Sequence, residues 1–274
     1  MTVHEPALGQ SAGPRLGGRT ALVTGSTDGL GLAVADALAC AGCSVMLNGL
    51  EPAAALQPKI TALQERAGVP VFYSQADLAS AQAVEALVEA TIAGLGGIDI
   101  LVNNAVVRHF APIVDFPPDR WDAALAVNLS AAFHAIRLSL PGMRARNYGR
   151  IFNMTSVYGT RGTVDRVDYI TTKSALLGLT RAVALENLEF DVTCHSICPG
   201  SVLTPNIESR VLRLMEERDL SREAAEAMFL KGKQPGGRFV SAQSVTDLLV
   251  FLCGPIARDM TGAMLPVEAG WLAS

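Results

Sequence analysis

The stretch TALVTGSTDGLGLAVADALAC at residues 20–40 decides the fold. Its first five residues form an apolar run that predicts a β-strand, and residues 32–40 have the composition and spacing of a helix. The turn between them contains glycines at positions 25, 29 and 31. A strand, a glycine-rich turn and a helix in this order are typical of a dinucleotide-binding unit.

The glycine turn provides what a pyrophosphate needs. Glycines allow a tight turn and let a phosphate approach the backbone, and the next helix directs free N–H groups and the positive end of its dipole at it. A plain turn without a ligand is the alternative, which the strand–turn–helix context disfavours. The cofactor-binding residues predicted in this stretch are Thr24, Gly25, Thr27, Gly29, Leu30 and Gly31.

The rest of the chain alternates strand and helix patterns. Further strands are predicted at residues 44–48, 69–75, 98–102, 150–154, 191–198 and 263–267. Helices are predicted in the segment ending at 67 and at 79–95, 120–143, 169–187 and 241–251. This alternation predicts the α/β class: a single Rossmann-type, doubly wound domain with a mostly parallel sheet and helices on both faces.

Two segments differ from this pattern. Residues 201–237 are charged and helical without a strand signal, and we expect them to form a helical lid over the site. Residues 1–18 are rich in Gly, Pro and Ala, and we expect a flexible leader there. The single domain is therefore predicted to span residues 19–274.

Composition narrows the class of protein. Half of the 274 residues are hydrophobic and 18% are charged, so a large core is available. The net charge is −4 and the basic residues are dispersed, so neither nucleic acid nor a membrane is an expected partner. Cys40 and Cys43 have the spacing of a redox or metal motif. Without a matching Cys/His pair, ordinary buried thiols in a reducing cytoplasm are favoured and no metal is expected.

The end of the second predicted strand bears on the cofactor. In dinucleotide-binding units an acidic residue often meets the adenosine ribose about 20 residues after the glycine turn. Here Asn48 stands at that place, followed by Glu51, and the sequence offers no nearby Lys or Arg for a 2′-phosphate. This favours NAD over NADP. Asp77, after the third strand, is interpreted as a helix cap, an adenine contact or both.

A second stretch, NMTSVYGTRGTVDRVDYITTK at residues 153–173, carries the chemistry. If a helix begins near Tyr169, Lys173 lies one turn further on the same face. A nearby cation favours a phenolate, and such a tyrosine can exchange a proton with a substrate hydroxyl. Ser156 is predicted to hold the substrate oxygen. A chance surface pair of Tyr and Lys is the alternative, so the motif depends on its context.

Asn128 lies inside the predicted helix at residues 120–143. A buried amide needs partners, so it is interpreted either as a structurally satisfied side chain or as a group at a kinked or hydrated site. Pro199 and Gly200 end the sixth strand at the carboxyl edge, where ligands bind in open parallel sheets.

Together these motifs resemble the short-chain dehydrogenase/reductase family over residue 19 to the C-terminus. The matching elements are Thr24-Gly25-x3-Gly29-x-Gly31, Asp77, Asn103-Asn104-Ala105, Asn128, Ser156, Tyr169-x3-Lys173 and Pro199-Gly200 with Thr204. The resemblance implies a seven-stranded sheet of order 3-2-1-4-5-6-7, an NAD(P) cofactor and a homotetramer or dimer. The additional cofactor contacts implied are Asn48, Leu78, Asn104, Ala105, Tyr169, Lys173, Pro199, Gly200, Val202 and Thr204.

The same resemblance implies the catalytic roles. Tyr169 is the acid/base, and Lys173 favours its phenolate and binds the nicotinamide ribose. Ser156 orients the substrate oxygen, and Asn128 holds a proton-relay water. A valine, Val106, stands where the family has a glycine beside the cofactor.

Within the family, the chain is similar to the bacterial D-3-hydroxybutyrate dehydrogenases. The segments that carry this likeness are 47–49, 109–112, 140–147, 233–235 and 270–272. The likeness implies D-3-hydroxybutyrate or acetoacetate as substrate, with NAD. Substrate contacts implied with the substrate oxygen or carboxylate are Arg108, Ser156, Tyr158, Arg166, Tyr169, Gln234 and Trp271. Of these, Arg108, Tyr158 and Arg166 replace the Gln, His and Lys of the relatives.

These replacements keep the pocket suited to an anion and make it more positive. Arg108 substitutes a planar cation for a neutral amide, and Arg166 can bind a carboxylate at two points. Tyr158 still donates a hydrogen bond. A short hydroxy or keto acid is therefore expected, with a second anionic or extra polar group as the natural variant. Alternatively, the two arginines point to solvent or pair with Asp165 and Asp168.

Two other functions are open. One is a dehydrogenase for a different alcohol, such as a sugar or cyclic polyol. The other is a non-catalytic nucleotide sensor on the same fold, which would be expected to lack the tyrosine or the lysine. The presence of Asn128, Ser156, Tyr169 and Lys173 together favours an enzyme.

Overall fold

The computed structural model describes residues 16–274. The predicted flexible leader lies almost entirely outside the described residues. Of its last three residues, Leu16 is buried in the core, and its N–H donates to the Ala41 carbonyl at 2.8 Å. The chain is thus packed on the domain at residue 16.

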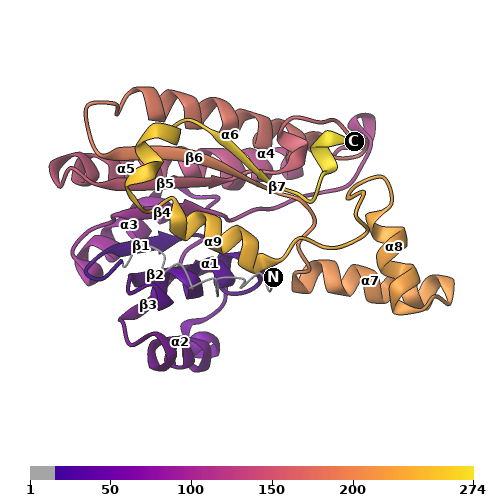
Figure 1. The fold of residues 1–274 in the computed structure, drawn as a ribbon, viewed down its shortest axis with the longest axis horizontal. Coiled ribbons are helices and arrows are strands. Elements are labelled where there is room, and N and C mark those ends of the chain that lie inside the picture. The colour runs from indigo at the N-terminus through magenta and orange to yellow at the C-terminus, as the bar shows by residue number, and fades with distance from the viewer. Residues whose placement is uncertain (1–15) are drawn as a thin grey trace, which may run out of the picture.

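Seven parallel strands form one sheet in the order β3-β2-β1-β4-β5-β6-β7 (Figure 1). The strands are β1 (Thr20–Val23), β2 (Ser44–Gly49), β3 (Val71–Gln75), β4 (Ile100–Asn103), β5 (Gly149–Met154), β6 (Val192–Pro199) and β7 (Met264–Val267). The predicted fold class and strand order are confirmed. The order reverses between β1 and β4, which creates a crevice at the carboxyl ends of these strands.

Helices cover both faces of the sheet (Figure 1). They are α1 (Gly29–Cys40), α2 (Ala53–Ala67), α3 (Ala81–Leu95), α4 (Pro118–Leu125), α5 (Ala131–Ala145), α6 (Val167–Leu185) and α9 (Ala242–Phe251). Alternate strand residues point to opposite faces. Ala21 and Val23 therefore join the core with α1, α2 and α9, whereas Leu22 joins the core with α3, α5 and α6. Because both faces are covered, the central strands are almost fully buried, although β5 and β6 include buried polar residues such as Asn153 and His195.

The helix predicted over residues 120–143 is observed from Pro118 to Ala145, but it is not regular. Residues 126–130 form a π-helical turn between α4 and α5, and Asn128 lies in it. Such turns are frequent at functional sites. By length and composition alone, this 28-residue span is apolar enough for a membrane helix, a property that core helices share. Here Ala131, Ala135 and Ile136 pack in the core beside α3.

The segment predicted as a lid forms two helices, α7 (Pro205–Arg218) and α8 (Arg222–Leu230), which project from one end of the sheet (Figure 1). They pack on each other through a small core of their own, which includes Val211 and Phe229. Arg222 pairs with Glu208 at 2.6 Å and joins the two helices. The helical prediction is confirmed here, and the covering role remains a prediction.

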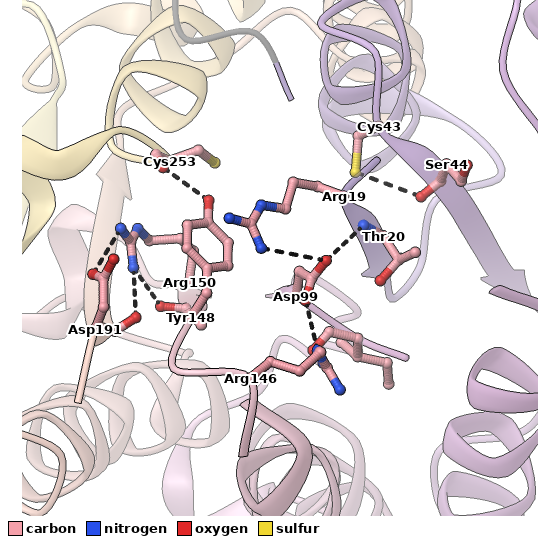
Figure 2. Close-up of polar contacts among 12 residues, drawn as sticks. Arg19, Thr20, Cys43, Ser44, Asp99, Arg146, Tyr148, Arg150, Asp191 and Cys253 are labelled. Carbon is pink, nitrogen blue, oxygen red and sulfur yellow. Dashed lines mark hydrogen bonds and ion pairs between the residues drawn. The ribbon is translucent and has the colours of Figure 1, made fainter. Parts of the chain in front are cut away.

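Charged side chains close the amino ends of the central strands (Figure 2). Asp99, just before β4, accepts hydrogen bonds from the Thr20 N–H at 3.2 Å and from Arg146 Nε at 3.0 Å. Arg19 lies 4.0 Å from the same carboxylate. Asp99 therefore ties the start of β1 to the end of α5.

The neighbouring Arg150 is fully buried at the start of β5. It pairs with Asp191 at 2.9 Å and donates to the Gly149 and Asp191 carbonyls (Figure 2). Its guanidinium carbon lies 4.3 Å from the Tyr148 ring centroid, and that of Arg19 lies 3.5 Å from the same centroid. At this edge, every arginine near the Tyr148 ring has a carboxylate partner.

The five cysteines are free thiols. Four are buried, among them Cys43 as predicted, but Cys40 at the end of α1 is exposed, so the prediction of a buried thiol is wrong there. Within residues 16–274, no group of His, Cys, Asp and Glu side chains has the arrangement of a metal site.

Candidate active site

A cleft of about 620 Å³ lies where β1, β2, β4, β5 and β6 end. It is the crevice at the reversal of strand order, where ligands bind in this class of sheet. The predicted cofactor residues that line it are Gly25, Thr27, Gly29, Leu30, Gly31, Asn48, Asp77, Leu78, Asn104, Ala105, Tyr169, Lys173, Pro199, Gly200, Val202 and Thr204. Ser156, Arg108 and Val106 also line it.

The glycine turn is shaped by close backbone contacts. Gly25 has φ +58°, and a Cβ there would lie 2.8 Å from the Ala105 Cα. A Cβ at Gly31 would collide with the Gly25 carbonyl oxygen. Only glycine fits at these two positions. The N-cap residue of α1, Asp28, makes no side-chain cap, so the first N–H groups of the helix remain available to an anion. A dinucleotide fits this cradle.

Thr24 does not line the cleft but holds its wall. Its Oγ1 accepts from the N–H groups of Asn104 at 2.9 Å and Ala105 at 3.1 Å. The Asn104 amide donates to the Thr24 and Gly25 carbonyls at 3.0 and 2.8 Å. Val106 is not among the residues with positive φ, so the backbone there does not require the glycine of the family pattern.

The Asn48 side chain makes its hydrogen bonds within the protein. Its Oδ1 accepts from the Gly25 N–H at 3.2 Å, and its Nδ2 donates to the Ser74 and Ala76 carbonyls at 3.3 and 3.2 Å. It therefore ties the ends of β1, β2 and β3 together. The charged group at this end of the cleft is Glu51, which accepts from Thr27 Oγ1 at 2.8 Å. A backbone hydrogen bond holds the pKa of Glu51 below its usual range.

Lys59 of α2 also reaches this corner. Its Nζ donates to the Thr27 carbonyl at 2.8 Å, and its charge contributes to lowering the pKa of Glu51. The expectation that no Lys or Arg lies nearby is therefore wrong. The α2 helix returns to the glycine turn and supplies a cation that strand spacing alone does not reveal.

Asp77 is exposed and lines the cleft. Its Oδ1 accepts from the Ala79 N–H at 3.0 Å, before α3 begins. The N-cap of α3 is Ser80, whose Oγ accepts from the Ala83 N–H at 3.3 Å. The capping role proposed for Asp77 thus belongs to Ser80, and Asp77 remains free to contact a ligand.

Ser156, Tyr169 and Lys173 meet in the cleft. The end of β5 delivers Ser156, whose Oγ accepts from the Tyr158 N–H at 3.3 Å. Helix α6 begins at Val167, so Tyr169 lies in its first turn. The Lys173 Nζ is buried, donates to the Met154 carbonyl at 2.6 Å and lies 5.6 Å from the Tyr169 ring centroid. The predicted helical neighbours are therefore brought together.

Burial and, to a smaller extent, the charge of Arg108 together lower the pKa of Lys173 to about 7. The amine is therefore only partly protonated at neutral pH. An acceptor bound beside it, such as a ribose hydroxyl, favours the ammonium form.

Asn128 is buried and does not line the main cleft. Its Oδ1 accepts from the Val107 N–H at 2.8 Å, and its Nδ2 donates to the Val107 carbonyl at 2.9 Å. Nδ2 also lies 3.3 Å from Thr172 Oγ1 on α6. Both predicted interpretations hold in part, because the amide has protein partners and lies in a π-helical turn.

Arg108 and Arg166 both face Tyr169. Their guanidinium carbons lie 5.5 and 5.9 Å from its ring centroid. Arg166 also lies 5.3 Å from the Tyr158 centroid and 4.3 Å from that of Phe110. Neither arginine forms an ion pair or a side-chain hydrogen bond within the described part of the chain. The charges therefore stand beside the predicted proton-transfer residue without partners.

The carboxylate of Asp168 is occupied by backbone donors. It accepts from the His109 N–H at 2.9 Å and from the Tyr169 N–H at 2.6 Å. Asp168 makes only a minor contribution to the pKa of Arg166, which burial lowers overall. The alternative in which the aspartates pair with the arginines is not observed. The alternative in which they point to solvent holds in part, because Arg108 is exposed whereas Arg166 is half-buried.

Four predicted substrate residues do not line the cleft: Tyr158, Arg166, Gln234 and Trp271. Trp271 is buried against Tyr158, with ring centroids 5.3 Å apart. The Gln234 Oε1 accepts from the Ser201 N–H at 3.0 Å, and its Nε2 donates to the Arg238 carbonyl at 2.8 Å. Gln234 thus fastens the two ends of the lid segment to each other.

Two lid residues were missed by sequence reasoning. The Arg210 guanidinium carbon of α7 lies 5.6 Å from the Phe110 centroid and 5.0 Å from that of Phe229. Lys233 Nζ lies 3.7 Å from the Phe229 centroid. Pro205 fixes the start of α7, so the spacing from Ile207, which lines the cleft, could have assigned Arg210 to the same face.

The fold, together with the position of Ser156, Tyr169 and Lys173 in the cleft, indicates the class of protein. Residues 19–213 match the family model described as short chain dehydrogenase. The chain belongs to the short-chain dehydrogenase/reductase family, oxidoreductases that act on hydroxyl groups and whose fold binds a nicotinamide cofactor. This confirms the family predicted from the motifs.

The chain is similar over nearly its whole length to particular members. The D-beta-hydroxybutyrate dehydrogenase of Cupriavidus necator is 41% identical over 258 residues, which cover 94% of this chain and 99% of the relative. The D-beta-hydroxybutyrate dehydrogenase of Rhizobium meliloti is 38% identical, with 93% and 99% covered. The predicted likeness to this branch of the family is confirmed.

A solved structure with the same architecture is the L-sorbose reductase of Gluconobacter frateurii complexed with NADPH and L-sorbose. Its TM-score is 0.90 at 29% identity, with 95% of this chain and 99% of that chain covered. The fold therefore accommodates both an acid and a sugar substrate class among proteins similar to this one.

Proposed function

We propose that the protein transfers a hydride between NAD and a small 3-hydroxy or 3-keto acid, with D-3-hydroxybutyrate and acetoacetate as the first candidates. The observation that carries this proposal is the position of Arg108 and Arg166 beside Tyr169 without carboxylate partners. Unpaired cations at the reacting residue favour an anionic substrate over a neutral alcohol. The similarity to two D-beta-hydroxybutyrate dehydrogenases supports the same substrate class.

The side chains divide the work as follows. Tyr169 accepts the proton of the substrate hydroxyl during oxidation and returns it during reduction. Ser156 donates a hydrogen bond that orients the same oxygen. Lys173 stabilises the phenolate. The proton-relay water is assigned to Asn128, where only the second lone pair of Oδ1 is free because Val107 and Thr172 take the other bonds of the amide. When bound, the nicotinamide accepts or supplies the hydride.

The carboxylate of the substrate is assigned to Arg166 and Arg108. A guanidinium can bind a carboxylate with two parallel hydrogen bonds, which fixes both its position and its orientation. Tyr158 separates Arg166 from Trp271 and contributes a hydroxyl at the same place. The hydroxyl carbon is then held toward Tyr169 and Ser156.

NAD is proposed over NADP because Glu51 lies at the adenosine end of the cleft. A carboxylate there repels a 2′-phosphate and can accept from ribose hydroxyls. Lys59 weakens this preference, and the L-sorbose reductase is described with NADPH, so the discrimination is expected to be moderate.

A cytoplasmic homotetramer is proposed on the family resemblance, and a monomeric mass by light scattering would overturn the tetramer.

The test is NADH or NADPH formation by the purified protein. The panel contains D-3-hydroxybutyrate, L-3-hydroxybutyrate, other hydroxy acids and neutral polyols, each with NAD and NADP. Turnover of hydroxy acids with NAD supports the proposal. A second candidate, reduction or oxidation of a sugar, rests on the likeness to the L-sorbose reductase. Activity on L-sorbose or polyols without activity on acids would favour it.

A further inference from the structure

We propose that the substrate carries a second anionic group, bound by Arg210 and Lys233 of the lid segment at the end of the molecule remote from the reacting hydroxyl. This inference rests on the proposed function. It goes beyond it by assigning a substrate class, a short dianionic hydroxy acid, rather than a monocarboxylate.

Three cations, Arg166, Arg210 and Lys233, lie one after another over two aromatic rings. Arg166 and Arg210 both lie over Phe110, at 4.3 and 5.6 Å from its centroid. Arg210 and Lys233 both lie over Phe229, at 5.0 and 3.7 Å. The row therefore begins beside Tyr169 with Arg166 and ends in the lid with Lys233. None of the three cations lines the cleft itself, but Ile207 on the same helix as Arg210 does, so the row lies on the lid side of the cleft.

The row has few compensating charges. Neither Arg210 nor Lys233 forms an ion pair in residues 16–274, and the ammonium of Lys233 donates to the Phe229 carbonyl at 2.6 Å. Burial lowers the pKa of Arg210, and the neighbouring Arg166 and Arg108 lower it further. Burial lowers the pKa of Lys233 to about 8, with added contributions from Arg210 and Arg166. Partly buried like charges repel one another unless an anion lies among them.

One carboxylate does not satisfy this set. The substrate carboxylate is already assigned to Arg166 and Arg108 at the reacting end. Arg210 then remains half-buried, with its charge near another guanidinium and without an anion. A second carboxylate or a phosphate on the same substrate would occupy the lid end of the row. A long thioester would instead lead out of the cleft and would not place an anion between Phe110 and Phe229.

The lid also contains a matched control. Arg213, one turn after Arg210 on α7, is exposed and lies 4.0 Å from Glu217 on the same helix. It carries the same charge on the same helix but lies away from the aromatic row. Substituting glutamine at either position removes one charge and keeps a long polar side chain.

The test compares kcat/KM for three substrates with NAD: D-3-hydroxybutyrate, 3-hydroxyglutarate and 3-hydroxybutyrate bearing a 4-phosphate. The wild-type protein is expected to prefer a dianion by roughly tenfold, the value of one additional charged hydrogen bond. Preference for the dicarboxylate or for the phosphate identifies the second group. Arg210→Gln should reduce kcat/KM for the preferred dianion more than for the monoacid, mainly through KM. Arg213→Gln should change neither.

Four outcomes would overturn the inference. The first is a wild-type preference for D-3-hydroxybutyrate over both dianions, which leaves the proposed function intact. The second is an equal loss for all substrates in Arg210→Gln, which would indicate a purely structural role. The third is turnover of none of the acids, which overturns the proposed function as well. Efficient reduction of acetoacetyl-CoA in place of the free acids would also reject the compact dianion.

Discussion

Arginines beside aromatic rings occur at both sides of the sheet, where the strands begin (the amino edge) and where they end (the carboxyl edge), but their charges are treated differently. At the amino edge, Arg19 and Arg150 lie on either side of Tyr148, and Asp99 and Asp191 neutralise them (Figure 2). At the carboxyl edge, Arg166 and Arg210 share the Phe110 ring, and no carboxylate in the described residues pairs with either.

This difference separates a structural role from a binding role. A partly buried cation costs free energy unless an anion lies beside it. At the amino edge the protein supplies that anion itself, so the cation stabilises the fold. At the carboxyl edge the anion has to come from a ligand. Substitutions at the two edges should therefore change different measured quantities.

The largest effect on catalysis is expected for Tyr169, which lies where the carboxyl edge meets the cofactor cleft. Tyr169→Phe removes the hydroxyl that exchanges the proton, so kcat should fall by roughly 10²–10⁴-fold. NADH binding, followed by fluorescence titration, should be retained because the ring remains. Full activity in this variant would refute the proton role.

The amino edge should respond in stability instead. Arg150→Met removes one partner of a buried pair and should lower the free energy of unfolding by roughly 3 kcal/mol. Urea unfolding measures this value, and kcat/KM per folded molecule should be unchanged. A variant that is as stable as wild type would break the proposed division between the edges.

His195 tests a third case, a buried polar group without a ligand. It lies in β6 against Phe152, with ring centroids 6.0 Å apart. Neither ring nitrogen makes a hydrogen bond of good geometry within residues 16–274, and the nearby Met260 backbone opposes the lowering of the His195 pKa only weakly. Burial lowers the pKa of His195 to about 4. The group is therefore neutral in the fold at neutral pH and needs no anion, unlike the arginines at either edge.

The sign of its effect on stability follows from linkage. Between the usual value near 6.5 and about 4, the unfolded state binds more protons than the folded state. Stability is thus complete above pH 6.5 and is lost as the pH falls toward 4, by roughly 2–3 kcal/mol. His195→Leu should show a smaller loss of stability over this window. Thermal unfolding at pH 4.5 and 7.5 makes the comparison, and parallel pH profiles for the two proteins would contradict it.

A smaller effect is expected for the carboxylate contact. Arg166→Met should raise KM for D-3-hydroxybutyrate by roughly tenfold, and more than it lowers kcat, because one charged fork is lost. Its stability should be equal to or above that of wild type, in contrast to Arg150→Met. An unchanged KM would reject Arg166 as the carboxylate ligand.

The smallest effect is expected at the adenosine end of the cleft. Glu51→Gln removes the charge that opposes a 2′-phosphate and leaves Lys59 in place. The ratio of kcat/KM for NADP to that for NAD should rise by about threefold, the scale of an exposed charge interaction. Equal ratios in the two proteins would show that Glu51 does not select the cofactor.

The sequence predicted the framework of the fold because its signals are local. Buried parallel strands read as short apolar runs, and glycines at 25, 29 and 31 mark a turn that admits no other residue at two positions. Tyr169 and Lys173 were linked by helical spacing within one element. Residues of this kind depend on the few positions around them.

The features that the sequence did not reveal depend on contacts between elements that are far apart in the sequence. Lys59 reaches the glycine turn only because α2 packs back toward it. The Asn128 amide fills its bonds through Val107 and Thr172, which follow from a π-helical turn. The place of Arg210 in the row of cations could not be predicted because it depends on a contact with Phe110, a hundred residues earlier in the chain. Likewise, Gln234 was expected at the substrate but is bonded to backbone groups.

The most direct test of the account compares two substrates that differ by a carboxylate. NADH formation by the wild-type protein would be measured with D-3-hydroxybutyrate and with butan-2-ol, a neutral secondary alcohol, at equal concentrations of NAD. If the unpaired cations at the carboxyl edge bind the carboxylate of the substrate, the acid should be oxidised efficiently and the neutral alcohol barely at all. Equal turnover of the two, or turnover of the alcohol alone, would contradict it.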